Sequence, residues 1–187
     1  MRLALLAIAM CGSVLGCSVA IPETTPTSGP TAAPDTELES LFPERVGGFE
    51  MTVSSASGEA GLSVLGDGDP ARLDQFLLDL GATREQLSVA TGTLVSADGA
   101  LESGLAMIAI RVAGLDASMT EDRLAQVVGS DVPNTVIDEQ ERGGKTVTAI
   151  SNAQDLTESV YLYPAGDVVF LVSGAPNLVE EALTQLP

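Results

Sequence analysis

The sequence predicts a single α+β domain, with a mostly antiparallel sheet of about six to seven strands and three helices packed on one face of it. Three observations lead to this fold class. Hairpin-type turn signals join pairs of strand-like segments, which favours antiparallel neighbours. Three further segments have the apolar spacing of helices, each with a single stripe that would cover the sheet. A Pro/Thr-rich segment gives way near residue 41 to regular apolar periodicity.

Three amphipathic helices are readable from their start and stop signals. The first begins at Asp69-Pro70, a capping acid followed by proline at the first helical position, and ends at Gly81. The second begins at Ser118 and ends at Gly129, and the third begins at Asn177. Both of these have a glutamate three residues after the start, as in a capping box. The apolar stripes consist of Leu73, Phe76, Leu77, Leu80, Leu124, Val127, Val128, Val179, Ala182, Leu183 and Leu186.

Strand patterns occupy the remaining chain. Residues 49–53 alternate between apolar and polar side chains, which is typical of a half-buried strand. Three pairs of segments flank turn residues and predict hairpins. They are 87–95 with 105–112 around Ala97-Asp98-Gly99, 136–137 with 146–150 around Gly143-Gly144, and 160–163 with 168–172 around residues 164–167.

A weak internal repeat is also present. Val46-Gly47-Gly48 and Arg142-Gly143-Gly144 each lead into a strand pattern, and Ile108–Gly114 and Val168–Gly174 each precede a helix. The order is the same in both places, so an internal duplication would relate residues 46–128 to 142–187, with an extra helix in the first half. Chance is the alternative, because two glycines before a strand are common.

Composition excludes several classes of function. The chain has 26 Asp and Glu against 8 Lys and Arg, a net charge of −18 and no His. Such a chain lacks the basic face that binds duplex nucleic acid and the imidazoles of triads and of most zinc or haem sites. Both Cys residues precede residue 18, so no disulfide framework is possible in the body. We expect no catalytic residue, no metal and no cofactor.

The N-terminus predicts a signal peptide over residues 1–16, with Arg2 before an apolar run. Val14-Leu15-Gly16-Cys17 resembles the lipobox of bacterial lipoproteins. The resemblance implies cleavage between Gly16 and Cys17, a diacylglyceryl group on the Cys17 sulfur and an acyl chain such as palmitate on the new amino terminus. Cys11 would be discarded with the signal. An ordinary cleaved signal or an uncleaved anchor over residues 3–20 is the alternative.

A linker is predicted over residues 17–40, followed by one domain over residues 41–187. Residues 18–38 hold four of the ten Pro and five Thr, a composition that cannot bury a core. Whether this linker is glycosylated stays open. The domain carries most of the acidic excess, so like charge would hold it away from an anionic membrane surface.

A second resemblance covers the body of the chain. Leu41-Phe42-Pro43, Val46-Gly47-Gly48 and the closing segment Glu181–Pro187 resemble a recurring type of small, Pro/Thr-tethered lipoprotein from high-GC bacteria. The resemblance implies an α+β fold and an envelope location. No activity is established for the type, so it carries no expectation about chemistry.

Four groups of side chains are candidates for a site. Asp67 and Asp69 are interpreted as a turn and a helix cap, with a weak surface calcium site as the alternative. The acids within residues 138–141 are interpreted as a solvated hairpin tip rather than a glycosidase pair. Lys145, the only Lys, is expected to be exposed. Tyr161 and Tyr163 share one face of a strand; core residues with an accessible hydroxyl are favoured over a binding patch.

These inferences converge on a membrane-anchored lipoprotein on the extracytoplasmic face of the cell membrane, with a non-catalytic binding or interaction domain. Its partners would be the membrane, through the N-terminal lipid, and a protein or ligand of the envelope, but no nucleic acid. The first alternative is a carrier of an apolar ligand or lipid held between sheet and helices. A carboxylate-based hydrolase is the remote alternative. Oligomeric state and the choice between inner and outer membrane stay open.

Overall fold

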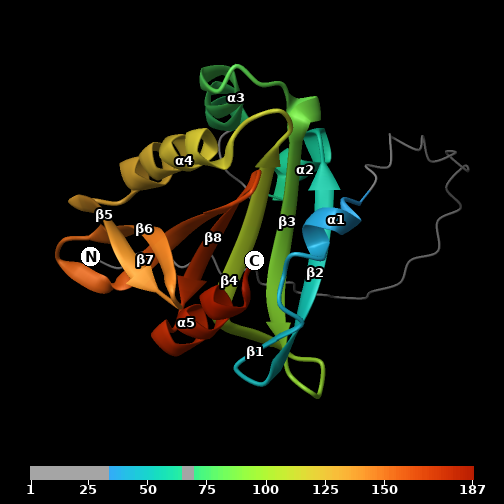
Figure 1. Cartoon of the computed structure of the whole chain (residues 1–187), viewed down its shortest axis with the longest axis vertical. Helices are drawn as coiled ribbons and strands as arrows, with labels where there is room; N and C mark the ends of the chain where they lie inside the picture. Colours follow the sequence, from blue (N-terminus) through green and yellow to red (C-terminus); the bar gives the residue numbers. More distant parts are fainter. Residues whose placement is uncertain (1–33, 65–69) are drawn as a thin grey trace, which may run out of the picture. The chain divides into compact units, whose positions relative to one another are not determined.

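The computed structural model describes residues 34–64 and 70–187 (Figure 1). Its elements follow one another as α1 (Thr36–Glu39), β1 (Arg45–Val46), β2 (Phe49–Ser57), α2 (Glu59–Val64), α3 (Pro70–Asp79), a 3-10 turn (Arg84–Gln86), β3 (Leu87–Val95), β4 (Leu101–Val112), α4 (Ala117–Asp131), β5 (Thr135–Arg142), β6 (Lys145–Asn152), β7 (Asp155–Ala165), β8 (Val168–Gly174) and α5 (Pro176–Gln185).

The strands form one open sheet in the order β1-β2-β3-β4-β8-β7-β6-β5, and every neighbouring pair is antiparallel. The predicted α+β class, the three hairpins and the three long helices are confirmed. The described part of the chain has eight strands, and the additional one is β1, whose two residues are too few to show an alternating pattern. Likewise α1 and α2, with four and six residues, are too short for an apolar stripe.

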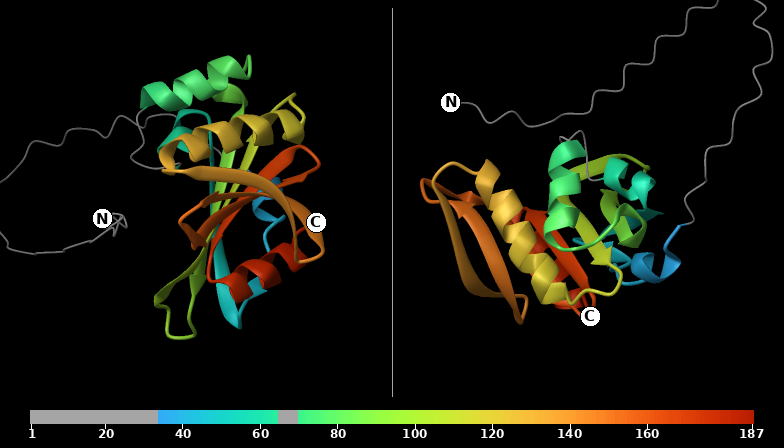
Figure 2. Two further views of the ribbon diagram at one scale, coloured as in Figure 1. Left: turned by 90° about the vertical axis from the view of Figure 1, so that its left-hand side faces the viewer. Right: turned by 90° about the horizontal axis from the view of Figure 1, so that it is seen from above.

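Helices cover both faces of the sheet, so the prediction that they pack on one face was wrong (Figure 2). Leu105 and Met107 of β4 pack with α5 and α1, whereas Ile110 and Val112 of the same strand pack with α3 and α4. The central strands β4 and β8 carry continuous apolar runs, and a strand that is apolar on both sides needs cover on both sides. The apolar stripe of a helix shows that it packs on the sheet, but it does not show on which face of the sheet.

The helix ends differ from the predicted ones by small shifts. Asp116 rather than Ser118 caps α4, and its Oδ1 accepts the Ser118 N–H at 2.9 Å. Gly129 lies inside α4 rather than ending it, and a Cβ there would come within 3.2 Å of Ile137 Cδ1. The glycine therefore favours the close approach of α4 to β5 within the helix, whereas the sequence pattern places it at the helix end.

Two glycine pairs hold α5 from both ends of the sheet. Gly47-Gly48 joins β1 to β2 and Gly143-Gly144 joins β5 to β6, and all four glycines have positive φ, as a two-residue type I′ turn requires. The Gly47 N–H donates to Glu181 Oε1 at 2.9 Å, and the Gly143 N–H donates to Glu180 Oε1 at 2.8 Å. The two hairpins therefore contact consecutive glutamates of one helix.

The strand order repeats, but the helices do not. Strands β1–β4 and β5–β8 form two meanders that meet at the β4–β8 pair, and each meander is followed by a helix. Helices α2 and α3 are additional in the first half, where the repeat predicts a single extra helix. However, α4 and α5 lie on opposite faces, and the proposed match of Ile108 with Val168 places equivalent residues on opposite faces as well. A duplication of the whole unit therefore stays a prediction.

The folded part begins before the predicted boundary at residue 41. Leu38 of α1 is fully buried and belongs to the core on the α5 side of the sheet. Asp35 caps α1, with Oδ1 accepting the Leu38 N–H at 3.0 Å. The Pro/Thr composition of the preceding residues masked this short helix. Among residues 34–64 and 70–187, no helix is long and apolar enough to cross a membrane.

Candidate functional site

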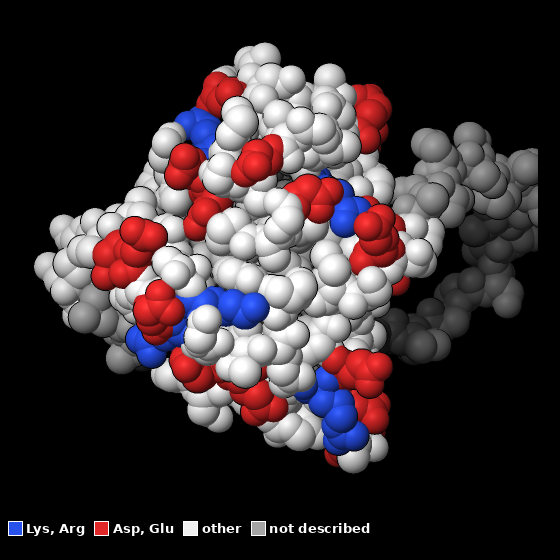
Figure 3. All heavy atoms as spheres, viewed as in Figure 1, with Lys and Arg blue, Asp and Glu red and all other residues white. Residues whose placement is uncertain are grey.

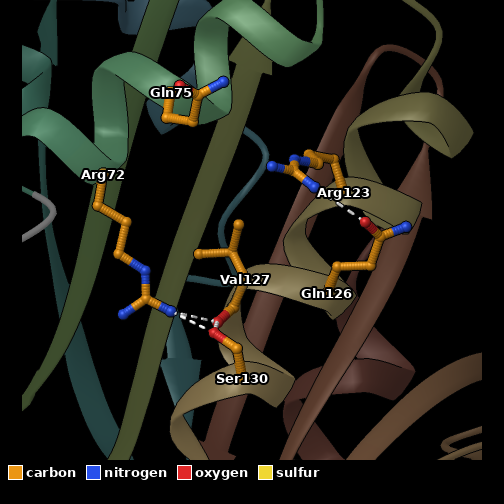
Figure 4. Close-up of a pocket in the computed structure, with 6 residues that line it drawn as sticks. All are labelled: Arg72, Gln75, Arg123, Gln126, Val127 and Ser130. Carbon is orange, nitrogen blue, oxygen red and sulfur yellow. Dashed lines mark hydrogen bonds between the residues drawn. The ribbon is translucent and has the colours of Figure 1, made fainter.

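A polar pocket of about 230 Å³ lies between α3 and α4, on the face of the sheet away from α5 (Figure 4). Its lining consists of Arg72 and Gln75 from α3 and of Arg123, Gln126, Val127 and Ser130 from α4.

The spacing of these residues explains why they meet. On α3, Arg72, Gln75 and Asp79 follow one another at i, i+3 and i+7, beside the apolar stripe that packs on the sheet. On α4, the pocket residues 123, 126, 127 and 130 have the equivalent spacing. Both helices bury their apolar stripes in one core, so their polar flanks face each other across the gap.

Arg72 joins α3 to the last turn of α4. Its Nη1 donates to both carboxylate oxygens of Asp131, at 2.6 and 2.7 Å, and its Nη2 donates to the Val127 carbonyl oxygen at 2.7 Å. The second nitrogen also donates to Ser130 Oγ. A guanidinium at a helix C-terminus satisfies free carbonyls and interacts favourably with the helix dipole. Arg72 therefore fixes the relative position of the two helices.

Arg123 makes the opposite connection, from α4 to the end of α3. Its Nη2 pairs with Asp79 Oδ2, and its Nη1 donates to Gln126 Oε1 at 2.9 Å. Gln75 Nε2 donates to the other Asp79 oxygen at 2.6 Å. The Nε of Arg123 is buried and has no hydrogen-bond partner among the described residues. The pocket thus contains two arginines, each with its own carboxylate.

This arrangement is suited to holding helices together and to contacting a small polar group. Each aspartate accepts charge-assisted hydrogen bonds from a guanidinium, so neither is a free base or a free acid. Each guanidinium is neutralised by its aspartate, so an anion would have to displace a carboxylate. The site is poorly suited to an acyl chain, because two guanidinium groups are among its lining side chains.

A separate group of carboxylates lies where α4 meets β5 and β6. Burial raises the pKa of Glu121, the nearby charges of Asp122 and Glu139 raise it further, and a hydrogen bond with Thr148 opposes the shift. This cluster does not line the arginine pocket. The acids of residues 138–141 lie within strand β5 and not at a hairpin tip, so that part of the prediction was wrong. The turn of the β5–β6 hairpin consists of Gly143 and Gly144 alone.

Lys145 is half-buried and engaged, contrary to the predicted exposure. Its Nζ donates to the Pro187 carbonyl oxygen at 3.0 Å and lies 5.1 Å from the centroid of the Tyr163 ring. The Tyr163 hydroxyl donates to the same oxygen at 2.6 Å. Tyr161 and Tyr163 both pack, partly buried, against the core on the α5 side, as the favoured interpretation expects. These residues secure the end of α5 rather than forming a free patch.

The predicted site residues of the N-terminus lie outside the described residues. Gly16, Cys17 and the signal peptide belong to residues 1–33, and Asp67 and Asp69 belong to residues 65–69. In the part of the chain that the structure describes, no three His, Cys, Asp or Glu side chains gather as a metal site would require. Acidic side chains are spread over the face drawn in Figure 3, with the few cations among them.

The arginine pocket could not be found from the sequence. Arg72 and Arg123 occupy polar positions of predicted helices, which is the ordinary place for a solvated side chain. Only the packing of both helices on one face of the sheet brings them together, and the sequence contains no signal for that. No protein-family model, curated protein or solved structure matches the chain.

Proposed function

We propose that this chain is a lipoprotein, anchored through Cys17 to the extracytoplasmic face of the cell membrane, whose folded domain binds a partner and catalyses no reaction. The observation that carries the proposal is the junction between the Pro/Thr-rich segment and the domain. A stretch whose composition cannot form a core ends there, and the folded domain begins with Asp35, which is held by a half-buried arginine.

The arginine at this junction is Arg111 of the central strand β4. Its side chain is 14% exposed and lies 3.4 Å from a carboxylate oxygen of Asp35, 3.6 Å from Glu37 and 3.1 Å from Asp167. The Asp35 backbone N–H donates to Ser55 Oγ at 2.7 Å. Ion pairs in a partly buried site are screened less than surface pairs. The domain is thus held at one point of its surface, next to the predicted tether.

The length of that tether suits display. From Cys17 to Asp35 the chain can reach at most about 60 Å when fully extended. Because the folded domain and many bilayers carry negative charge, repulsion would favour positions away from the surface.

The non-catalytic part of the proposal is supported by the state of the carboxylates in the arginine pocket. Asp79 and Asp131 are each bound to a guanidinium, which suits a structural pair better than a proton donor or a nucleophile. The alternative of an apolar-ligand carrier gains no support from this pocket, because two arginines and two glutamines are among its lining residues. The hydrolase alternative would need two acids facing one substrate pocket.

Replacement of the predicted lipidated cysteine tests the anchor. We expect Cys17→Ala to abolish incorporation of labelled fatty acid and to leave the chain out of the washed membrane fraction, because the acyl chains provide the attachment. Cys11→Ala is the matched control and should incorporate label like the parent chain. Membrane retention of the Cys17→Ala chain after alkaline or high-salt washing would contradict the lipid anchor.

A further inference from the structure

β5 is the terminal strand of the sheet, opposite to β1 (Figure 1, Figure 2). It runs for eight residues, Thr135–Arg142, and pairs with β6 along its whole length. Within residues 34–64 and 70–187, no other strand pairs with it. A strand edge of this length presents backbone donors and acceptors that another extended segment can bind.

The register shows which residues turn their backbone groups outward. The two-residue turn at Gly143-Gly144 closes on the hydrogen-bonded pair Arg142 and Lys145. Residues of an antiparallel pair alternate between bonding their neighbour and pointing away from it. Ile137, Glu139 and Glu141 therefore direct their N–H and C=O groups toward the free edge. An added strand would find three consecutive bonding positions there.

The charged side chains around this edge are mainly acidic, and the exception on β5 is Arg142, which lies over the Tyr161 ring. Asp138, Glu139 and Glu141 come from β5, and Glu121 and Asp122 come from the adjoining part of α4. No salt bridge joins any of these five acids to a cation in the described part of the chain. The negative charges of Asp122 and Glu139 disfavour ionisation of Glu121. The edge therefore has a negative potential that a cationic partner would neutralise.

Apolar contacts are also offered at the start of the strand. Val136 is 40% exposed and Ile137 is 47% exposed, and they point to opposite faces because neighbours in a strand alternate. Ile137 also lies close to α4 at Gly129. Apolar side chains on both faces would pack against alternate residues of an added strand.

We propose that the outer edge of β5 binds an extended, Lys/Arg-rich segment of a partner protein by strand addition. A second copy of this chain does not suit the edge, because edge-to-edge pairing would bring the same acids together. The inference identifies the partner class for the proposed binding function. It does not depend on the lipid anchor, so the two can fail separately.

A designed peptide tests the edge. The full-length chain, taken from whichever cell fraction contains it and kept in mild detergent, is titrated with a peptide of alternating Lys and Val that matches β5 in length. A peptide of alternating Glu and Val is the matched control. We expect only the cationic peptide to bind, more weakly at high salt, and to slow hydrogen exchange at the amides of residues 137, 139 and 141. Equal binding of both peptides, binding of neither, or protection of amides elsewhere would overturn the proposal.

Variants at one position separate the backbone from the charge. Glu139→Pro removes an outward N–H without breaking a β5–β6 bond, and proline is tolerated at such edge positions. We expect it to weaken binding about 10-fold, because it loses one hydrogen bond together with one exposed charge. Glu139→Gln keeps the N–H and should weaken binding about 2- to 5-fold, as one exposed charge does.

Two further variants control for a general effect of net charge and for a failure of Glu139→Pro to fold. Glu44→Gln, an exposed acid near the opposite edge, changes net charge equally and should bind the cationic peptide like the parent. If Glu139→Pro does not fold, Glu139→Lys replaces it, since reversal of the charge should weaken the cationic peptide more than Glu139→Gln does. Equal effects of Glu44→Gln and Glu139→Gln would show that net charge alone attracts the peptide, which contradicts a site at β5.

Discussion

The two ends of the sheet begin from the same hairpin geometry but differ in what covers them. At both ends a pair of glycines forms a two-residue turn and donates an N–H to α5. At the first end, the terminal strand β1 has only two residues. The Glu44 carbonyl, just before β1, accepts the Met51 N–H of β2, and α1 packs beside β2. At the second end, the terminal strand β5 has eight residues, and no described strand pairs with its outer edge.

This difference separates two roles within one domain. The chain from the predicted tether enters on the side of the covered end, where Asp35 contacts Ser55 of β2 and reaches Arg111 of the central strand β4. The open end lies across the sheet from that entry point. A partner bound to β5 would therefore not compete with the tether for the same surface. The following experiments test whether attachment lies toward one end of the sheet and binding at the other.

The largest effect is expected where the second turn touches α5. A Cβ on Gly143 would lie 2.8 Å from Leu183 Cβ and from the Thr184 backbone N, and backbone atoms cannot move aside. Positive φ adds a penalty for any L-residue. We expect Gly143→Ala to lower the free energy of unfolding by about 3–5 kcal/mol, measured by denaturant titration.

Two neighbouring glycines provide the controls for that value. Gly144→Ala meets open space and should cost only about 1–2 kcal/mol for its positive φ. Gly47→Ala, in the equivalent turn, meets the tip of the Leu178 side chain, which can change rotamer, so its cost should fall between the other two. Equal losses at Gly143 and Gly144 would show that α5 is not held tightly by the second hairpin.

A smaller effect is expected at the covered end. Arg111→Gln leaves Asp35, whose side chain is 16% exposed, without its cationic partner. We expect a loss of about 1–3 kcal/mol in the free energy of unfolding, together with faster proteolysis near residue 35. Arg45→Gln is the matched control, because Arg45 and Glu50 are well exposed and 4.0 Å apart, and such pairs contribute little. An unchanged free energy of unfolding in Arg111→Gln would mean that this residue does not fix the junction.

The smallest effect concerns the acids beside the open edge. The pKa of Glu121 is raised above its ordinary value of 4.5 because burial and like charges disfavour the ionised form. Folding is therefore opposed by this group at neutral pH, and the opposition is lost as pH falls through the raised pKa toward 4.5. Glu121→Gln should stabilise the domain by roughly a few tenths of a kcal/mol at pH 7, after allowance for screening by solvent.

The pH dependence of that gain distinguishes its cause. Stabilisation by Glu121→Gln should disappear at a pH below 4.5, where the parent carboxyl is protonated in both states. Asp138→Asn, which removes an acid from the exposed side of β5, is the control and should show a smaller change at neutral pH. A gain from Glu121→Gln that persists unchanged in acid would mean that packing rather than charge is responsible.

The sequence predicted the hairpins and the long helices because both depend on local signals. Gly143-Gly144 and the alternation on either side of it specify a hairpin without any distant contact. The side of the sheet taken by α5 was not predictable, because it depends on which face of β8 is left open after α4 has packed. Short elements such as α1 were missed for a similar reason. Leu38 is one apolar residue in a polar stretch, and only the core shows that it is buried.

The candidate sites divide in the same way. The interpretation of Tyr163 as a core residue needed only strand periodicity. By contrast, the pairing of Arg72 with Asp131 joins residues 59 positions apart, and the open edge of β5 follows from the order of strands in the sheet. Both depend on the tertiary arrangement, and the sequence contains no local signal that predicts it.

The most direct test of an attached edge and an open edge is photo-crosslinking in intact cells from a residue at each. The crosslinking side chain replaces Glu139 on β5 in one chain and Glu44 near β1 in the other. We expect Glu139 to yield a crosslink to an extended Lys/Arg-rich segment of another envelope protein, and Glu44 to yield none to that protein. Equal crosslinking from both positions, or a crosslink from position 139 to a second copy of this chain, would contradict the account.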